Sequence, residues 1–124
     1  MDRILIVEDD DNRRFWFDHR FAQYERDTTD DVSVAIQWLL QQEYALIFLD
    51  HDLAEEHYHL AMADDGLTGY VVAAWLAAHP ERQVEAQIIV HSLNYPGSQR
   101  MVDCLQSAGR SAEHVPFPYL SQLF

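Results

Sequence analysis

The sequence contains no lysine. All eight basic residues are arginine, and 21 acidic residues oppose them, so the formal net charge is −13. Proteins that hold long nucleic acid rely on many Lys and Arg contacts to phosphate, and this charge balance argues against that class. The balance still permits contact with a nucleotide, with the end of an RNA or with a basic partner.

Cysteine and long apolar runs are scarce as well. The single Cys104 excludes an intramolecular disulfide and any zinc site built from cysteines. No apolar run approaches the roughly 20 residues of a membrane-spanning helix. The chain does not open on a secretory signal, so we expect a cytoplasmic protein without membrane contact. Of its 124 residues 48% are hydrophobic, which predicts one domain over 1–124 with a sizeable core.

Apolar runs alternate with helical patterns along the chain, which predicts an α/β fold. The strands are expected at 3–7, near 25–29, at 46–49, at 87–90 and at 115–117. The helices are expected at 13–24, 32–42, 68–79 and 96–108. Such an order predicts a flavodoxin-like three-layer sandwich with a parallel five-stranded sheet in the order 2-1-3-4-5. Residues 118–124 are too few for a full closing helix, so the last helix should be missing or vestigial.

Polar residues follow three of the expected strands. Glu8 and Asp9 follow the first, Asp50-His51-Asp52 follows the third, and His91-Ser92-Leu93-Asn94 follows the fourth. In an open parallel sheet, ligands bind outside the carboxyl ends of the strands, where the strand order reverses. The alternative is that these residues only form turns and helix caps, which Asp, Ser and Asn favour.

These motifs resemble the receiver domain of two-component response regulators over nearly the whole chain. The resemblance implies that Glu8 and Asp9 are the metal-binding acidic pair, Asp50 the phospho-accepting aspartate and Ser92 the Ser/Thr switch residue. Val115 stands where receivers carry a lysine, and no lysine elsewhere can replace it. The connection after Asp50 is also longer than in most receivers. A protein partner or a homodimer remains open.

A narrower resemblance covers two short motifs, Leu49-Asp50-His51-Asp52-Leu53 and His91-Ser92-Leu93-Asn94. They are similar to the cyclic-phosphate processing receiver-like family. That family is associated with RNA-repair gene neighbourhoods and is proposed to act on cyclic phosphates at RNA ends. The site residues that the resemblance implies are Asp50, His51, Asp52, His91, Ser92 and Asn94.

A metal site is predicted at the acidic strand ends. Glu8, Asp9 and Asp50 supply hard oxygen ligands, which suit Mg²⁺ (or Mn²⁺). The alternative is a hydrated acidic cluster that caps a helix. Asp50 could instead accept a phosphoryl group, but the resulting acyl phosphate would lack the lysine that compensates its charge. His57-Tyr58-His59, within the connection 51–66, is a weak ligand pair because two histidines do not define a zinc site.

Proton transfer and phosphate binding are assigned to the other polar residues. His51, His91 and Asp52 are predicted to be catalytic, because opening a cyclic phosphate needs a base for water and an acid for the leaving oxygen. Ser92, Asn94 and Ser98 are predicted to bind phosphate at a helix N-terminus, with Arg100, or Arg13 and Arg14, within reach. The alternatives are that His91 is a hydrogen-bonded core histidine, that His51 is a surface histidine, and that the Ser and Asn residues are ordinary helix caps.

These residues and the two resemblances support two main hypotheses about function. The first is a metal-assisted phosphoesterase that acts on phosphate esters, with RNA 2′,3′-cyclic phosphate ends among the candidate substrates. The alternative is a phosphorylation-independent atypical receiver that serves as a signalling or protein-interaction module. A third hypothesis, Mg²⁺-dependent phosphotransfer to Asp50, is disfavoured by the absence of lysine.

Overall fold

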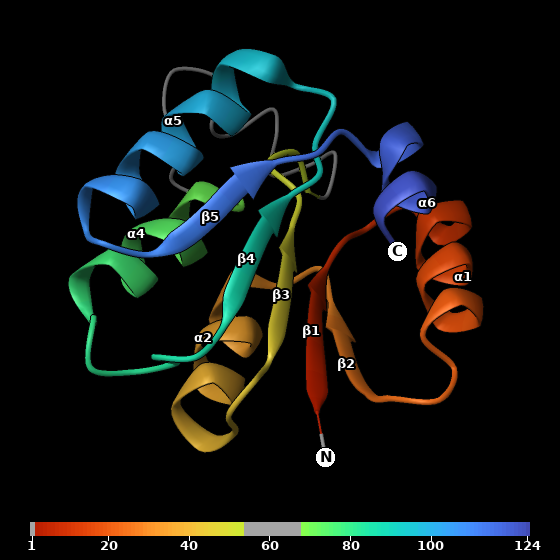
Figure 1. Cartoon of the computed structure of the whole chain (residues 1–124), viewed down its shortest axis with the longest axis horizontal. Coiled ribbons are helices and arrows are strands. Elements are labelled where there is room, and N and C mark those ends of the chain that lie inside the picture. The colour runs from red at the N-terminus through yellow and green to blue at the C-terminus, as the bar shows by residue number, and fades with distance from the viewer. Residues whose placement is uncertain (1, 54–67) are drawn as a thin grey trace.

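Five parallel strands form one sheet in the order β2-β1-β3-β4-β5 (Figure 1). The computed structural model describes residues 2–53 and 68–124. Its elements, in chain order, are β1 (Arg3–Val7), α1 (Asp11–Arg20), β2 (Glu25–Thr29), α2 (Val32–Gln41), β3 (Leu46–Leu49), α4 (Tyr70–Ala78), β4 (Gln87–Val90), α5 (Tyr95–Ser107), β5 (Ser111–His114), the 3₁₀ turn η1 (Phe117–Tyr119) and α6 (Leu120–Leu123). The predicted fold class and strand order are confirmed.

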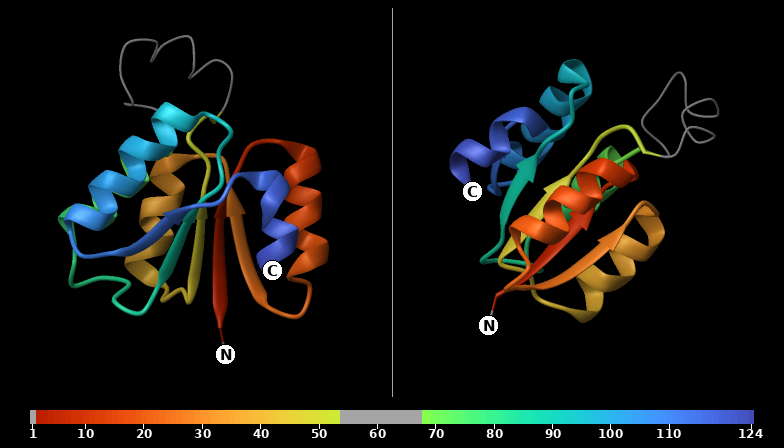
Figure 2. Two further views of the ribbon diagram at one scale, coloured as in Figure 1. Left: turned by 45° about the horizontal axis from the view of Figure 1, so that its top comes forward. Right: turned by 90° about the vertical axis from the view of Figure 1, so that its right-hand side faces the viewer.

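Helices cover both faces of the sheet, as Figure 2 shows. On one face α2, α4 and α5 pack on alternate strand residues, such as Leu5, Ile47 and Ile88. The intervening residues, such as Phe48 and Ile89, pack against α1 and the short α6 on the other face. Because the central strands are buried on both faces, their sequences are continuous apolar runs, and this is why they could be predicted.

The first helix ends earlier than predicted, at Arg20 and not at Tyr24. The chain must reverse here because Glu25 pairs with Arg3 in the sheet. Arg26 supports this turn, since its guanidinium donates to the carbonyl oxygens of Phe21 (2.8 Å) and Tyr24 (3.0 Å). The aromatic spacing that suggested a longer helix therefore continues into a turn.

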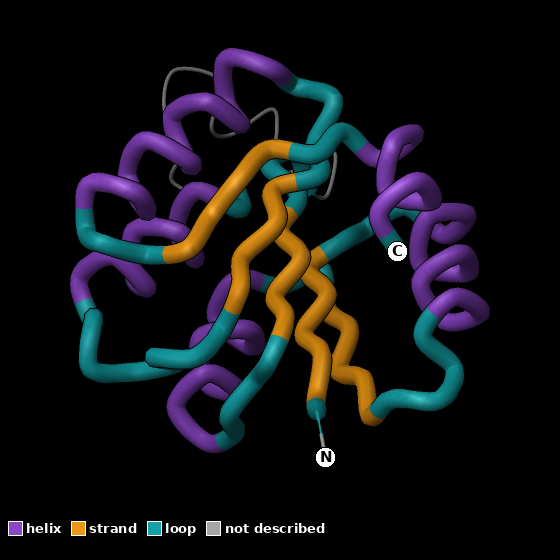
Figure 3. The backbone as a smooth tube through the Cα atoms, in the orientation of Figure 1, coloured by secondary structure: helices purple, strands orange, loops and turns teal. Residues whose placement is uncertain are grey.

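The prediction of a fifth strand at 115–117 is wrong, because β5 spans Ser111–His114. This strand lies at the edge of the sheet and pairs with β4 alone, so its residues need not be apolar (Figure 3). The segment 115–117 continues beside the end of β4. There Val115 donates its N–H to the Val90 carbonyl, and Phe117 donates to that of His91, both at 2.9 Å.

The last helix is vestigial, as predicted, with four residues in α6. In the described part of the chain, no helix has the length and apolar character needed to cross a membrane. The expected helices at 32–42, 68–79 and 96–108 are present with ends shifted by one or two residues.

Candidate functional site

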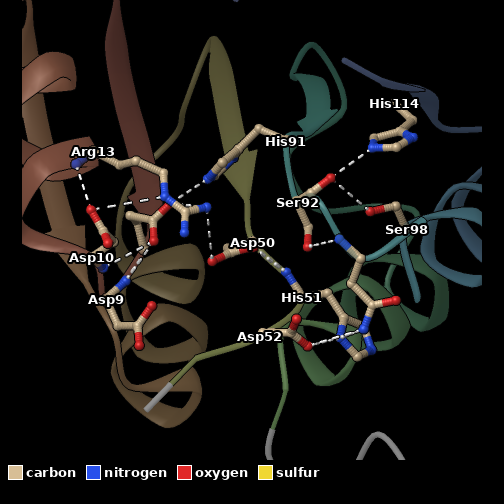
Figure 4. Close-up of polar contacts among 12 residues, drawn as sticks. Asp9, Asp10, Arg13, Asp50, His51, Asp52, His91, Ser92, Ser98 and His114 are labelled. Carbon is tan, nitrogen blue, oxygen red and sulfur yellow. Dashed lines mark hydrogen bonds and ion pairs between the residues drawn. The ribbon is translucent and has the colours of Figure 1, made fainter. Parts of the chain in front are cut away.

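The register of the sheet brings three polar strand ends together. Val7 lies beside Leu49, and Leu49 lies beside Val90. The residues that follow these positions, Glu8, Asp50 and His91, therefore meet at the carboxyl ends of the central strands. Figure 4 shows Asp50 and His91 there. Within the described residues, one ligand atom from each of the three lies within 4.8 Å of the others.

Glu8 is fully buried and held by hydrogen bonds to both oxygens. Its Oε2 accepts the backbone N–H groups of Asp9 and Asp10, each at 3.0 Å. Its Oε1 lies 2.7 Å from Nε2 of His91. Burial raises the pKa of Glu8, although the hydrogen bond from the Asp10 backbone opposes that shift. Asp9 is only half-buried and is not among the three residues of the cluster.

Asp50 is also almost completely buried, with 2% of its surface exposed. Its Oδ1 accepts the backbone N–H of His51 at 2.9 Å, and its Oδ2 lies 4.0 Å from a guanidinium nitrogen of Arg13. Burial, and next the charge of Glu8, raise the pKa of Asp50 to about 7. Two carboxylates buried side by side favour a bound cation, because a cation would offset their repulsion.

His91 is neutral at pH 7, because complete burial lowers its pKa to about 4. No acceptor lies near Nδ1 among the described residues, so we place the ring proton on Nε2, which then donates to Oε1 of Glu8. Its Nδ1 is buried, and within the described residues it has no hydrogen-bond partner. A metal-bound histidine normally donates its second ring N–H to an acceptor. Coordination through Nε2 would leave a buried Nδ1–H without an acceptor, so His91 suits orienting Glu8 better than binding a metal.

A pocket of about 240 Å³ opens beside Asp50. Most of the described residues that line it are polar or charged, which suits a small charged ligand. The lining residues are Arg13, Asp50, Asp52, Ser92, Leu93 and Asn94. Of the predicted site residues, Asp50, Asp52, Ser92 and Asn94 thus share one pocket. Arg13, which the sequence analysis expected within reach of a phosphate, lines it as well.

His51 is not among the residues that line this pocket. It packs against Gly97, where an added Cβ would fall 2.6 Å from the ring. Nδ1 of His51 lies 2.7 Å from Oδ1 of Asp52 (Figure 4). Asn94 donates its Nδ2–H to the same oxygen at 3.1 Å. Within the described residues, Oδ2 of Asp52 accepts no hydrogen bond, so it remains available to a ligand in the pocket.

Ser92 and Ser98 have structural partners. The Ser92 hydroxyl accepts the N–H of Asn94 at 3.0 Å, whereas Ser98 is fully buried and donates to the Ser92 carbonyl at 3.4 Å. Asn94 caps α5, since its Oδ1 accepts the N–H of Gly97 at 3.0 Å. The N–H of Gly97 therefore serves this cap, although the sequence analysis predicted that the N-terminus of this helix binds phosphate.

Two glycines support the site in a way that the sequence did not reveal. An added Cβ on Gly69 would lie 1.7 Å from the carbonyl oxygen of Asp50, so the backbone of α4 approaches the site closely. Gly97 makes room for the His51 ring in the same way. A glycine at the start of each helix that follows a motif was the available signal, but the residue that each glycine contacts is known only from the fold. His57 and His59 lie outside the described residues.

A parallel sheet with acidic residues at the ends of β1 and β3 is the arrangement of a receiver domain. Solved receivers share the fold. TrrA from Thermotoga maritima, in complex with Mg²⁺ and beryllofluoride, is 22% identical with a TM-score of 0.69 over 99% of this chain and 96% of that one. A CheY-like receiver from Methanospirillum hungatei is 18% identical with a TM-score of 0.67 over 99% and 90%. The Mn²⁺-bound response regulator Rcp1 is 17% identical with a TM-score of 0.67 over 94% and 81%.

Residues 4–107 match the model of the cyclic-phosphate processing receiver domain, and the chain belongs to that family. No curated protein sequence matches the chain. The predicted family membership is thus confirmed. The solved receivers are below 25% identity, so their likeness concerns the fold alone.

Proposed function

We propose that this protein is a metal-assisted phosphoesterase that hydrolyses cyclic phosphates, with 2′,3′-cyclic phosphates at RNA ends as the first candidates. The observation that carries the proposal is the pocket that Asp50 and Asp52 share with Ser92 and Asn94. A family described by cyclic-phosphate processing supports the same substrate class. The net charge of −13 favours a short RNA end over a long duplex.

Glu8 and Asp50 would hold the divalent cation. Their side chains supply carboxylate oxygens held by backbone hydrogen bonds, and Mg²⁺ and Mn²⁺ prefer such hard ligands. The cation, when bound, supplies positive charge beside the phosphoryl oxygens. His91 serves this site by orienting Glu8, so its proposed role is positioning and not the proton transfer first predicted for it.

Asp52 is the residue to which we assign the proton transfer. Its Oδ1 is held by His51 and Asn94, which directs the carboxylate into the pocket. Asp52 takes a proton from the water that attacks phosphorus. A new P–O bond forms, the ring P–O bond breaks, and the proton passes from Asp52 to the leaving ribose oxygen. The product is a phosphate monoester. His51 then acts on the reaction through Asp52, as a positioning residue.

The test is hydrolysis of 2′,3′-cyclic AMP and of a short RNA with a 2′,3′-cyclic phosphate end, in Mg²⁺ or Mn²⁺. The full chain should release the monoester, and Asp52→Asn should lower the rate by roughly 100-fold or more, because an amide cannot accept the proton. Asp103→Asn, on the exposed surface of α5, is the matched control and should retain the rate. Absence of turnover with either metal would refute the proposal.

A phosphorylation-independent receiver is the second candidate. It is favoured by the fold of the solved receivers and by Val115, which is 8% exposed and packs in the core where the resemblance puts a lysine. This candidate predicts that beryllofluoride binds weakly or not at all, that no ester is hydrolysed, and that a protein partner or a second copy is bound. Light scattering with the purified chain distinguishes a monomer from a homodimer.

A further inference from the structure

We propose that Arg13 is the anion-binding residue of the pocket and contacts the phosphoryl oxygens of the ligand. Arg13 is the only basic side chain that lines this pocket in the described part of the chain. Asp50 and Asp52 face the same space, so an anionic ligand needs a positive charge at its other side. The inference rests on the proposed function and identifies the residue that recognises the phosphate.

The position of Arg13 is set by three acidic groups and one aromatic ring. Its guanidinium nitrogens lie 3.8 Å from Glu8 Oε1, 3.9 Å from Asp10 Oδ1 and 4.0 Å from Asp50 Oδ2. The guanidinium carbon lies 5.8 Å from the centre of the Phe117 ring, within the range of a cation–π contact. α1 thus presents the guanidinium to the site through a side chain supported on two sides.

These acidic contacts leave the donors of Arg13 available. All three distances exceed the roughly 3.2 Å limit of an N–H···O hydrogen bond. Within the described residues, no side-chain hydrogen bond of Arg13 is formed, and 26% of the side chain is exposed. A planar guanidinium with available N–H groups can donate to two phosphoryl oxygens at once. A lysine ammonium instead binds phosphate as a single point charge.

The opposite side of the pocket supplies the other contacts. Figure 4 shows Arg13 and Ser92 on either side of Asp50. A phosphate beside Asp50 would therefore lie between the guanidinium and the β4–α5 loop that carries Ser92 and Asn94. Arg14 follows Arg13 on the same helix and is not among the residues that line the pocket, so the two arginines form a matched pair.

Titration of inorganic phosphate into the full chain with Mg²⁺ tests the inference, with binding measured by calorimetry or ³¹P NMR. Arg13→Gln should weaken phosphate binding by roughly 10- to 100-fold, the effect of losing a charged hydrogen-bonding partner. Arg13→Lys should bind phosphate more tightly than Arg13→Gln but more weakly than wild type, because it keeps the positive charge and lacks the paired N–H donors of the guanidinium. Arg14→Gln should bind within about twofold of wild type, since it is outside the pocket.

Three results would overturn the inference: no phosphate binding by wild type at tens of millimolar, equal binding by Arg13→Gln, or an equal loss in Arg14→Gln. Circular dichroism checks that each variant is folded, and Arg13→Lys decides the matter where Arg13→Gln does not fold. Phosphate binding that depends on Arg13 without ester turnover would refute the hydrolase alone. Turnover with unchanged phosphate binding in Arg13→Gln would refute the role of Arg13 alone.

Discussion

Replacement of Asp50 by asparagine should stabilise the metal-free protein at pH 8. Burial and the charge of Glu8 raise the pKa of Asp50 from 3.8 to about 7. A carboxyl group with a raised pKa in the folded state stabilises the fold fully only below its unfolded pKa, and this contribution is lost as pH rises through the folded pKa. At pH 8 the wild type therefore carries a buried negative charge that the Asp50→Asn variant lacks.

The magnitude follows from the two pKa values. The difference between 3.8 and about 7, at roughly 1.4 kcal/mol for each pH unit, sets an upper limit of about 4 kcal/mol. Asparagine keeps an Oδ1 that can accept the His51 N–H, but it loses the 4.0 Å pairing with Arg13. We expect a gain of about 2 to 4 kcal/mol at pH 8, and a gain smaller by roughly 2 kcal/mol at pH 5.

Urea unfolding in EDTA at the two pH values measures this free energy of unfolding. Asp103→Asn removes an exposed carboxylate from α5 and should change it by less than about 0.5 kcal/mol at either pH. Added Mg²⁺ or Mn²⁺ should stabilise the wild type more than Asp50→Asn, because the variant has lost a ligand. A loss of stability in metal-free Asp50→Asn at pH 8 would show that the buried Asp50 carboxylate does not destabilise the fold.

Two further predictions concern the surroundings of the cluster. Electron spin-echo spectra of bound Mn²⁺ should lack the coupling of a directly bound imidazole nitrogen, because His91 orients Glu8 and its Nδ1 has no acceptor within the described residues. A strong coupling that changes on ¹⁵N-histidine labelling would show a histidine ligand and contradict this prediction. Gly69→Ala should destabilise the fold by about 3 kcal/mol or more in thermal or urea unfolding, because the added Cβ meets the backbone of Asp50. Gly97→Ala should cost roughly 1 to 2 kcal/mol, because its Cβ meets the His51 ring, which is a side chain and can move. Equal effects of the two substitutions would contradict this prediction.

The central strands, and the polar residues that follow them, could be predicted from the sequence alone. β1, β3 and β4 are buried on both faces, so each must be a continuous apolar run, and such runs are visible in one sequence. The edge strand β5 has no such requirement, and its position was predicted wrongly. The end of α1 was also missed, because Arg26 stabilises a turn from the neighbouring strand.

The way in which the site residues face one another depends on the tertiary packing. Asp50-His51-Asp52 are consecutive, yet Asp50 turns toward Glu8, and His51 turns toward Gly97. A sequence cannot indicate which side of a short loop each side chain takes, since that depends on the space left by other elements. The glycine in α5 gives His51 its place, and a helix from the other face brings Arg13 to the pocket. The residue types therefore sufficed to predict a phosphate- and metal-binding site. The role of each residue in that site depends on how distant segments pack.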